Sequence, residues 1–160
     1  MSIFPTKILL STDGSSEAVL ASRTAAELAE STGSELHVVF VLPIRAPFEY
    51  EAMGFAIEGP HEEVKQEGRH RLDEYVSQIE EAGGAVAEAH FRMGQPDDQI
   101  VRLAEELGVG MIVMGSRGHG GVRRSLLGSV SDSVVRHAHC PVTVVRAGKR
   151  RLTEGEEQNA

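Results

Sequence analysis

The alternation of two hydrophobic patterns limits the fold of this chain more than any other feature. Five short apolar runs, several rich in β-branched residues, have the length of buried strands. Between them lie four longer stretches in which apolar residues recur with helical spacing. In chain order, we expect strands at residues 7–11, 35–41, 85–92, 110–114 and 141–146, and helices at residues 15–32, 61–82, 96–107 and 129–139.

Local signals mark the ends of several expected helices. Ser15 or Ser16 is positioned to cap the first helix, because a serine oxygen can accept from a free N–H group. The second helix is expected to end near Gly83, and Pro96 is a favourable first residue for the third. These signals agree with the boundaries that the hydrophobic pattern indicates.

Repeated strand–helix alternation predicts the α/β class, with a doubly wound parallel sheet and helices on both faces. A chain of 160 residues suits a single domain. We expect this domain to span residues 1–147, followed by a polar, disordered tail at 148–160. The connection at residues 42–59 holds three of the seven Phe and Tyr residues. Its length predicts a functional or moving segment.

Composition restricts the classes of partner and compartment. A formal net charge of −8 argues against general nucleic-acid binding. The single cysteine, Cys140, excludes an internal disulfide and a metal site built from several cysteines. The start of the chain lacks a signal-peptide pattern, and no apolar run approaches the ~20 residues that span a bilayer. We therefore expect a cytoplasmic protein without nucleic-acid or membrane partners.

The segment from Gly115 to Ser129 combines five glycines and three arginines with no acidic residue. Glycines allow backbone N–H groups to converge on an anion, and the following helix presents unpaired N–H groups at its start. Ser129 can cap that helix or donate its hydroxyl to a phosphate. The alternative is that the glycines only let a loop turn. The position of the glycine segment, after an expected strand and before an expected helix, favours phosphate binding.

Ligands of an open parallel sheet bind beyond the carboxyl ends of the strands, where the strand order reverses. If the first and fourth strands are neighbours, the turn after residue 11 and the glycine segment face one crevice. The G-x-G-x-x-G fingerprint does not fit, because Arg123 stands at its last position. A Walker loop does not fit either, because Gly121 and Val122 replace its Lys and Ser or Thr. Neither a Rossmann dehydrogenase nor a P-loop NTPase is supported.

The spacing Gly115-x2-Gly118-x9-Gly128-Ser129 resembles the ATP-binding motif of the universal stress protein family. The resemblance extends from "KILLSTDGS" through "ELHVVFV" to "MGSRGHGGVRRSLLGSVSDSVVRHAHCPVTVVR", and so reaches Arg146. It implies an adenine nucleotide alpha hydrolase-like fold with strand order 3-2-1-4-5. It also implies ATP, accompanied by Mg²⁺, in the crevice between the first and fourth strands.

The resemblance assigns nucleotide contacts to particular positions. Asp13 is implied beside adenine and ribose, and the backbone of Val41 is implied to meet adenine. The residues at the end of the fourth strand are implied at the ribose, and the glycine segment is implied at the phosphates. The complete implied set is Asp13, Val41, Met114, Gly115, Arg117, Gly118, Gly128, Ser129 and Val130.

Several of these residues have simpler interpretations. Asp13, which precedes Gly14, can belong to a common turn or cap the next helix. Val41 is a core strand residue in either case. Arg117, with Arg123 and Arg124, can neutralise phosphate oxygens or lie on a solvated surface. For His119 the surface interpretation is favoured.

The resemblance implies an ATP-dependent stress-response or signalling module with an unknown protein partner. It also implies a homodimer formed through the edge strand from Pro141 to Arg146. A second hypothesis is a slow ATPase or adenylyl-transferring enzyme, but no catalytic set is visible and no catalytic residue is assigned. A third is a nucleotide-free dimeric interaction module, and a fourth is a relative of the electron-transfer flavoproteins.

Histidines provide no predicted metal site. His137 and His139 lie close to Cys140, but no second ligand cluster accompanies them, so this corner is interpreted as structural. His37 and His90 fall in expected strands without an evident partner. His61 and His70 are expected on the surface of the long helix.

Overall fold

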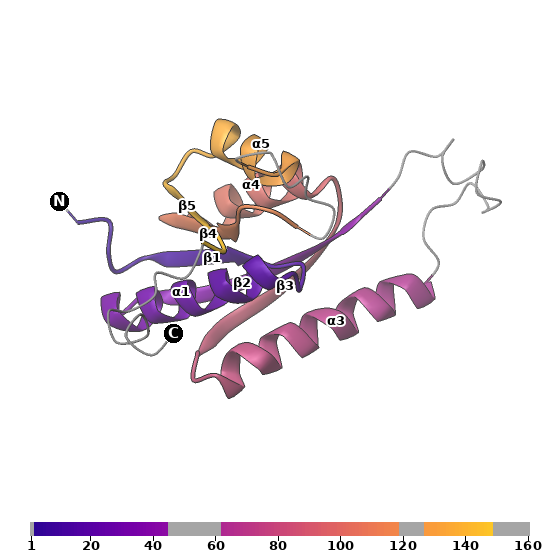
Figure 1. Cartoon of the computed structure of the whole chain (residues 1–160), viewed down its shortest axis with the longest axis horizontal. Helices are drawn as coiled ribbons and strands as arrows, with labels where there is room; N and C mark the ends of the chain where they lie inside the picture. Colours follow the sequence, from indigo (N-terminus) through magenta and orange to yellow (C-terminus); the bar gives the residue numbers. More distant parts are fainter. Residues whose placement is uncertain (1, 45–61, 119–126, 149–160) are drawn as a thin grey trace, which may run out of the picture.

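The computed structural model describes residues 2–44, 62–118 and 127–148. Nine regular elements follow one another within these ranges (Figure 1). In chain order they are β1 (Lys7–Ser11), α1 (Ser16–Thr32), β2 (Glu35–Pro43), α3 (Glu62–Glu81), β3 (Val86–Gly94), α4 (Pro96–Leu107), β4 (Met111–Gly115), α5 (Ser129–His137) and β5 (Val142–Val145).

The five strands form one parallel sheet in the order β3-β2-β1-β4-β5. Helices α1 and α3 cover one face of the sheet, and α4 and α5 cover the other (Figure 1). The predicted doubly wound α/β fold and its strand order are therefore confirmed. Because the strand order reverses between β1 and β4, a crevice is expected beyond the carboxyl ends of these two strands.

Each face of the sheet has its own hydrophobic core, because alternate residues of a strand point to opposite faces. Ile8 and Leu10 of β1 pack with Ala21 and Ala25 of α1. Leu9, between them in the chain, packs on the opposite face with residues of α4 and α5. All five side chains are fully buried. The small alanine side chains let α1 lie close to the sheet.

Two helix starts follow the predicted signals. Ser15 is the N-cap of α1, and its Oγ accepts from the N–H group of Ala18 at 3.3 Å. Gly33 ends α1 in the left-handed conformation, with φ of 66°. Pro96 is the first residue of α4, whose bounds match the prediction at both ends.

Other boundaries differ from the predictions by one or two residues. Strands β2 and β3 both run two residues further than predicted, because they continue to pair with each other up to Pro43 and Gly94. Strand β4 begins at Met111 rather than at residue 110. Helix α5 ends at His137 rather than at residue 139, since Ala138 already has extended backbone ahead of the proline that precedes β5.

The domain boundary at residue 147 stays a prediction. The expectations for residues 45–59 and 149–160 fall outside the described residues. Within the described ranges, none of the helices combines the length and the apolar character needed to cross a bilayer.

Candidate functional site

A pocket of about 690 Å³ lies beyond the carboxyl ends of β1, β2 and β4. This volume is typical of a small-molecule binding site. The residues that line the pocket come from the turn after β1, the end of β2, the two ends of the glycine segment and the starts of α4 and α5. They include every residue of the predicted nucleotide set: Asp13, Val41, Met114, Gly115, Arg117, Gly118, Gly128, Ser129 and Val130. The structure therefore brings these nine residues together, and their contact with a nucleotide stays a prediction.

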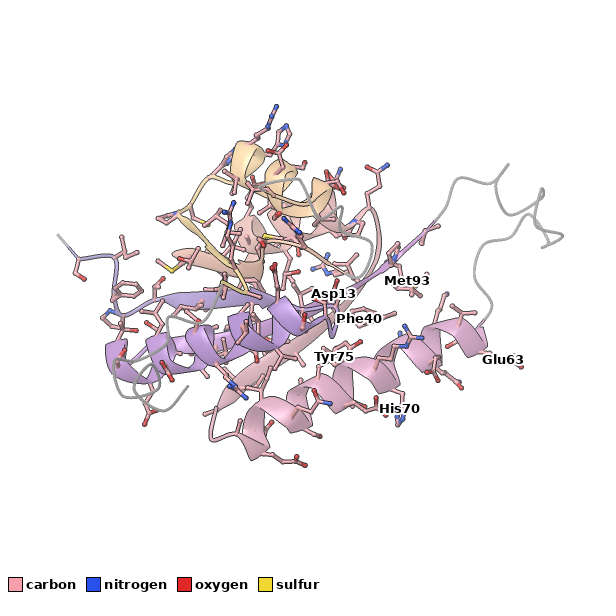
Figure 2. The ribbon with its side chains drawn as sticks, in the orientation of Figure 1. Asp13, Phe40, Glu63, His70, Tyr75 and Met93 are labelled. Atoms are coloured by element: carbon pink, nitrogen blue, oxygen red, sulfur yellow. The ribbon has the colours of Figure 1, made fainter. Side chains whose placement is uncertain are left out.

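The turn between β1 and α1 places Asp13 at the mouth of the pocket. Asp13 Oδ1 accepts from the N–H group of Ser15 at 2.9 Å, and its carbonyl accepts from the Tyr75 hydroxyl at 3.1 Å. Figure 2 shows Asp13 at this turn, with Tyr75 and Phe40 nearby. The helix cap is Ser15, so Asp13 shapes the turn and does not cap α1.

Gly118 lies directly against the Asp13 carboxylate. A Cβ atom added at Gly118 would collide with Asp13 Oδ2. Any larger residue at position 118 would therefore displace this carboxylate or the loop. The close approach gives Gly118 a physical role besides that of a flexible turn.

Glu17, in the first turn of α1, holds the start of the glycine segment. Its Oε2 accepts from the Ser116 hydroxyl and from the N–H group of Arg117, the latter at 2.8 Å. Its Oε1 accepts from the N–H group of Ala147 at 3.3 Å. Partial burial on its own raises the pKa of Glu17, but the hydrogen bonds from these three residues outweigh it and lower the pKa below its ordinary value.

The carbonyl of Ser116 joins the two ends of the glycine segment. It accepts from the N–H group of Gly128 at 2.6 Å and from the Ser131 hydroxyl at 2.7 Å. A Cβ atom at Gly128 would lie 3.1 Å from the same carbonyl oxygen, which is tight. Residues 119–126 between these ends, with His119, Arg123 and Arg124, lie outside the described residues.

The N-terminus of α5 forms one wall of the pocket. Gly128 occupies the N-cap position and Ser129 is the first helical residue, so Ser129 is not the cap. The N–H group of Asp132 donates to the Gly128 carbonyl at 2.9 Å. The N–H groups of the three residues before Asp132 therefore have no carbonyl within the helix to bind. Together with the helix dipole, they make this end of α5 suitable for an anion.

The opposite part of the pocket is apolar. Val41 and Met114 are 7% and 4% exposed, and Phe40 and Ile100 also line the cavity. These side chains form a surface on which a flat, apolar group can pack. Arg71 and Arg117 add positive charge at the edge, and Asp13 and Asp132 are the carboxylates among the lining residues. The pocket thus combines an apolar part with a helix end that is suited to an anion.

Several residues that build this site were not singled out by sequence analysis. Glu17, Ser116 and Ser131 fix the ends of the glycine segment, and Tyr75 supports the turn at Asp13. Ser116 and Ser131 lie close in sequence to the motif glycines, inside the segment that resembles the family. Their position there could have identified them as candidate site residues. Glu17 and Tyr75 carry no such signal.

The two histidines of the corner after α5 have different partners, and the structural interpretation of this corner stays a prediction. His137 Nδ1 lies 2.8 Å from the carbonyl of Ser133 one helical turn earlier, whereas His139 pairs with Glu105 of α4 at 3.1 Å. The two histidines thus have separate partners. Within the described ranges, the only group of three potential metal ligands lies elsewhere, on β2 and β3.

Comparison with known proteins identifies the family. The model of the universal stress protein family matches residues 5–146. The chain belongs to this family. Universal stress protein MJ0531 of Methanocaldococcus jannaschii is 34% identical over 148 residues, which cover 90% of this chain and 84% of the relative. Universal stress protein YxiE of Bacillus subtilis is also 34% identical, over 88% of this chain and 98% of the relative.

Solved structures of family members share the fold. A universal stress protein from Archaeoglobus fulgidus in complex with dAMP is 28% identical, with a TM-score of 0.64. The match covers 90% of this chain and 99% of that protein. A universal stress protein in complex with cAMP is 25% identical with a TM-score of 0.64, over 91% of this chain and 98% of that protein. Adenine nucleotides are therefore ligands of two structural neighbours of this universal stress protein.

Proposed function

We propose that this universal stress protein binds ATP in the pocket beyond β1, β2 and β4 and acts as a nucleotide-dependent signalling module in the cytoplasm. The observation that carries the proposal is the convergence of all nine predicted residues on that pocket. The nucleotide complexes of two structural neighbours support the same ligand class.

The two chemical halves of the pocket suggest how the nucleotide lies. Adenine packs against the apolar side chains of Val41 and Ile100. The phosphates lie at Gly118 and at the N-terminus of α5, where N–H groups and the helix dipole favour negative charge. The ribose then falls between them, near Asp13 and Gly115. This direction agrees with the family motif.

Mg²⁺ would enter with the nucleotide phosphates. Asp13 and Asp132 are the carboxylates among the lining residues. Asp132 pairs with Arg136 at 3.1 Å and Asp13 is expected nearer the nucleoside, so phosphate oxygens and water are expected to hold the ion without a protein side chain. The ion would screen the phosphate charge from these acids.

ATP turnover is expected to be slow at most. Rapid hydrolysis needs a positioned water and charge stabilisation of the transferring phosphoryl group. Asp13, one of the two carboxylates that line the pocket, has one oxygen engaged with the N–H group of Ser15 and is expected nearer the nucleoside. A turnover rate above roughly one per second would instead indicate a dedicated enzyme.

We further propose a homodimer through β5. This strand lies at one edge of the sheet and carries four consecutive apolar or β-branched residues. An edge of this kind is prepared to pair with another strand. A second copy in antiparallel orientation would extend the sheet across the dimer axis. A change in this assembly on nucleotide binding is one way to signal to a protein partner.

Equilibrium titration with ATP and Mg²⁺ tests the proposed ligand. Gly118→Asp and Gly128→Asp each place a carboxylate where the phosphates are proposed to lie, so each is expected to weaken binding more than tenfold. Gly148→Asp is the matched control, because it adds the same charge at an exposed glycine with open space around its Cα. Circular dichroism checks that every variant is folded.

Parallel titrations with ADP, AMP and cAMP define the preferred phosphate number. Equal weakening in the Gly148→Asp control would contradict the proposed location. A folded wild-type protein that binds none of the four nucleotides would refute the ligand proposal. The nucleotide-free dimeric interaction module would then be the better account.

A further inference from the structure

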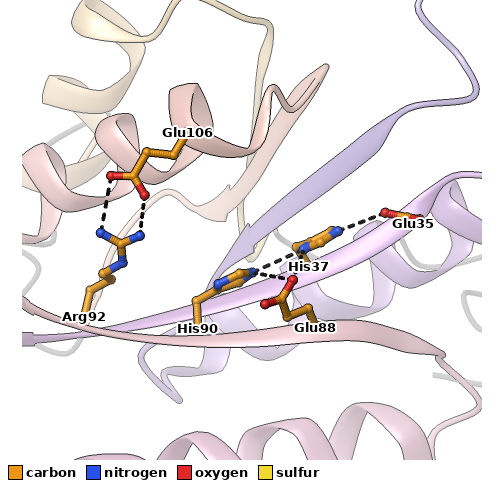
Figure 3. Close-up of polar contacts among 6 residues, drawn as sticks. All are labelled: Glu35, His37, Glu88, His90, Arg92 and Glu106. Atoms are coloured by element: carbon orange, nitrogen blue, oxygen red, sulfur yellow. Dashed lines mark hydrogen bonds and ion pairs between the residues drawn. The ribbon is translucent and has the colours of Figure 1, made fainter.

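Three potential metal ligands meet on the sheet face that α4 covers, outside the nucleotide pocket. His37 belongs to β2, and Glu88 and His90 belong to β3 (Figure 3). His37 Nδ1 lies 3.2 Å from His90 Nε2, and each of these nitrogens lies 3.9 Å from Glu88 Oε2. Two imidazole nitrogens and one carboxylate oxygen therefore converge on one point.

The register of the sheet creates this arrangement. An irregularity between Leu36 and His37 shifts the pairing, so that His37 lies opposite Glu88 and Val39 lies opposite His90. Residues 88 and 90 are two apart on β3 and therefore share a face. That face also carries Arg92, which pairs with Glu106 of α4.

Glu35 orients the His37 ring. Its Oε2 lies 3.1 Å from His37 Nε2, and a carboxylate only accepts hydrogen bonds. The Nε2 atom of His37 therefore donates to Glu35, so Nδ1 accepts from His90 Nε2 at 3.2 Å, and a bound ion would displace this His90 proton. Metal-binding histidines in proteins commonly have such a carboxylate on the second ring nitrogen.

We propose that His37, Glu88 and His90 form a binding site for a divalent transition metal of the Zn²⁺ class. Two ligands of a tetrahedral Zn²⁺ ion with bonds of 2.0–2.1 Å lie about 3.3 Å apart. The two nitrogens already have nearly this separation, and the oxygen needs to move only slightly. The donor set of two imidazoles and one carboxylate suits Zn²⁺ better than Mg²⁺ or Ca²⁺, which prefer oxygen ligands.

The burial of the three side chains fits a site with one open position. The side chains of His37 and His90 are 5% and 12% exposed, whereas that of Glu88 is 61% exposed. The two rings are thus held by the sheet, and the carboxylate is free to close on an ion from solvent. A water molecule or a ligand would take the fourth position.

The site is separate from the nucleotide pocket and does not depend on the proposed function. His37 precedes Val41 by four residues of β2, which is about 13 Å along a strand. A bound ion would connect β3, an edge strand, to β2. Metal binding is therefore expected to raise the melting temperature of the protein even without nucleotide.

Isothermal titration with ZnCl₂ tests this site on untagged, nucleotide-free full-length protein treated with a chelator. We expect one ion per chain, with binding at least tenfold weaker in His90→Gln and in Glu88→Gln. His70→Gln is the matched control, because His70 also pairs with a glutamate, Glu74 at 3.0 Å, but lies exposed on α3. The control is expected to bind Zn²⁺ like the wild type.

Cobalt provides a second readout, because Co²⁺ in a tetrahedral nitrogen and oxygen site absorbs visible light. If His90→Gln fails to fold, Glu88→Gln decides the result, since its exposed side chain can change without disturbing the core. Absence of saturable Zn²⁺ binding by the wild type would overturn the proposal. Unchanged affinity in the folded ligand variants would overturn it as well.

Discussion

Glu17 shows how a single side chain fixes the geometry of the candidate site. Its carboxylate binds Ser116 and Arg117 after β4 and Ala147 after β5, so it ties both strand ends to α1. These partners lie 99, 100 and 130 residues away in the chain. No local pattern links positions so far apart, so the role of Glu17 could not be predicted from the sequence. The nine predicted residues, in contrast, fall in short segments whose spacing is readable.

Glu17→Gln is expected to lower the free energy of unfolding at neutral pH by about 1–2 kcal/mol, because it weakens charge-assisted hydrogen bonds. Urea denaturation measures this change. Glu27→Gln is a suitable control, since it removes the same charge from an exposed position of the same helix. Equal destabilisation by both variants would mean that net charge, and not the contacts of Glu17, sets the effect.

The difference between wild type and Glu17→Gln should depend on pH. Folding lowers the pKa of Glu17 below its ordinary value of 4.5. The ionised side chain therefore contributes its full stability above about pH 4.5, and this contribution is lost as the pH falls through the folded pKa. Denaturation curves at several pH values should show the two proteins converging in acid. A constant difference down to pH 3 would contradict this assignment.

At the scale of elements, the ends of the helices carry the clearest energetic expectations. Ser15→Ala removes the side-chain cap of α1 and should lower the free energy of unfolding by about 1 kcal/mol.

Gln95, the N-cap of α4, makes no side-chain cap bond although its backbone is extended as a cap requires. Gln95→Ser should therefore raise the free energy of unfolding by roughly 0.5 kcal/mol. Urea midpoints test both, and a destabilised Gln95→Ser protein would contradict the capping argument.

The same elements show how far sequence reasoning extends. Helix α4 was predicted with its observed bounds because Pro96 marks its start and the helical apolar pattern ends at Leu107. Strand β3 was placed less accurately, since Glu88, His90 and Arg92 interrupt its apolar pattern. The contact between His37 and His90 was not predicted, because it depends on the register irregularity next to His37. Register of this kind is set by tertiary packing and is not visible in local sequence.

For the whole molecule, the outer edge of β5 is where the sheet either ends, among the residues that the structure describes, or continues into a second copy. The carbonyls of Pro141 and Val145 accept from β4 and the residue after it at 3.0 and 2.9 Å. Backbone groups of alternate residues point to opposite sides of a strand, so those of Val142 and Val144 point away from β4. These outward groups are the ones that a second copy of β5 would bind.

Val144→Pro removes an outward N–H group and keeps the bonds to β4, so it should convert the proposed homodimer to a monomer. Val144→Thr preserves both the N–H group and the β-branched shape and serves as the control. Sedimentation velocity measures the assembly state of each protein. A Val144→Pro protein that stays dimeric would place the interface on another surface.

Amide NMR during a titration with ATP and Mg²⁺ tests whether ATP binds beyond β1, β2 and β4. We expect saturable shifts that are largest for the amides of Asp13, Gly118, Ser129 and Val130, with little change at His37. The absence of saturable shifts would contradict this proposal. So would shifts centred on a separate cavity of about 540 Å³, whose lining includes Arg23 and Gly84.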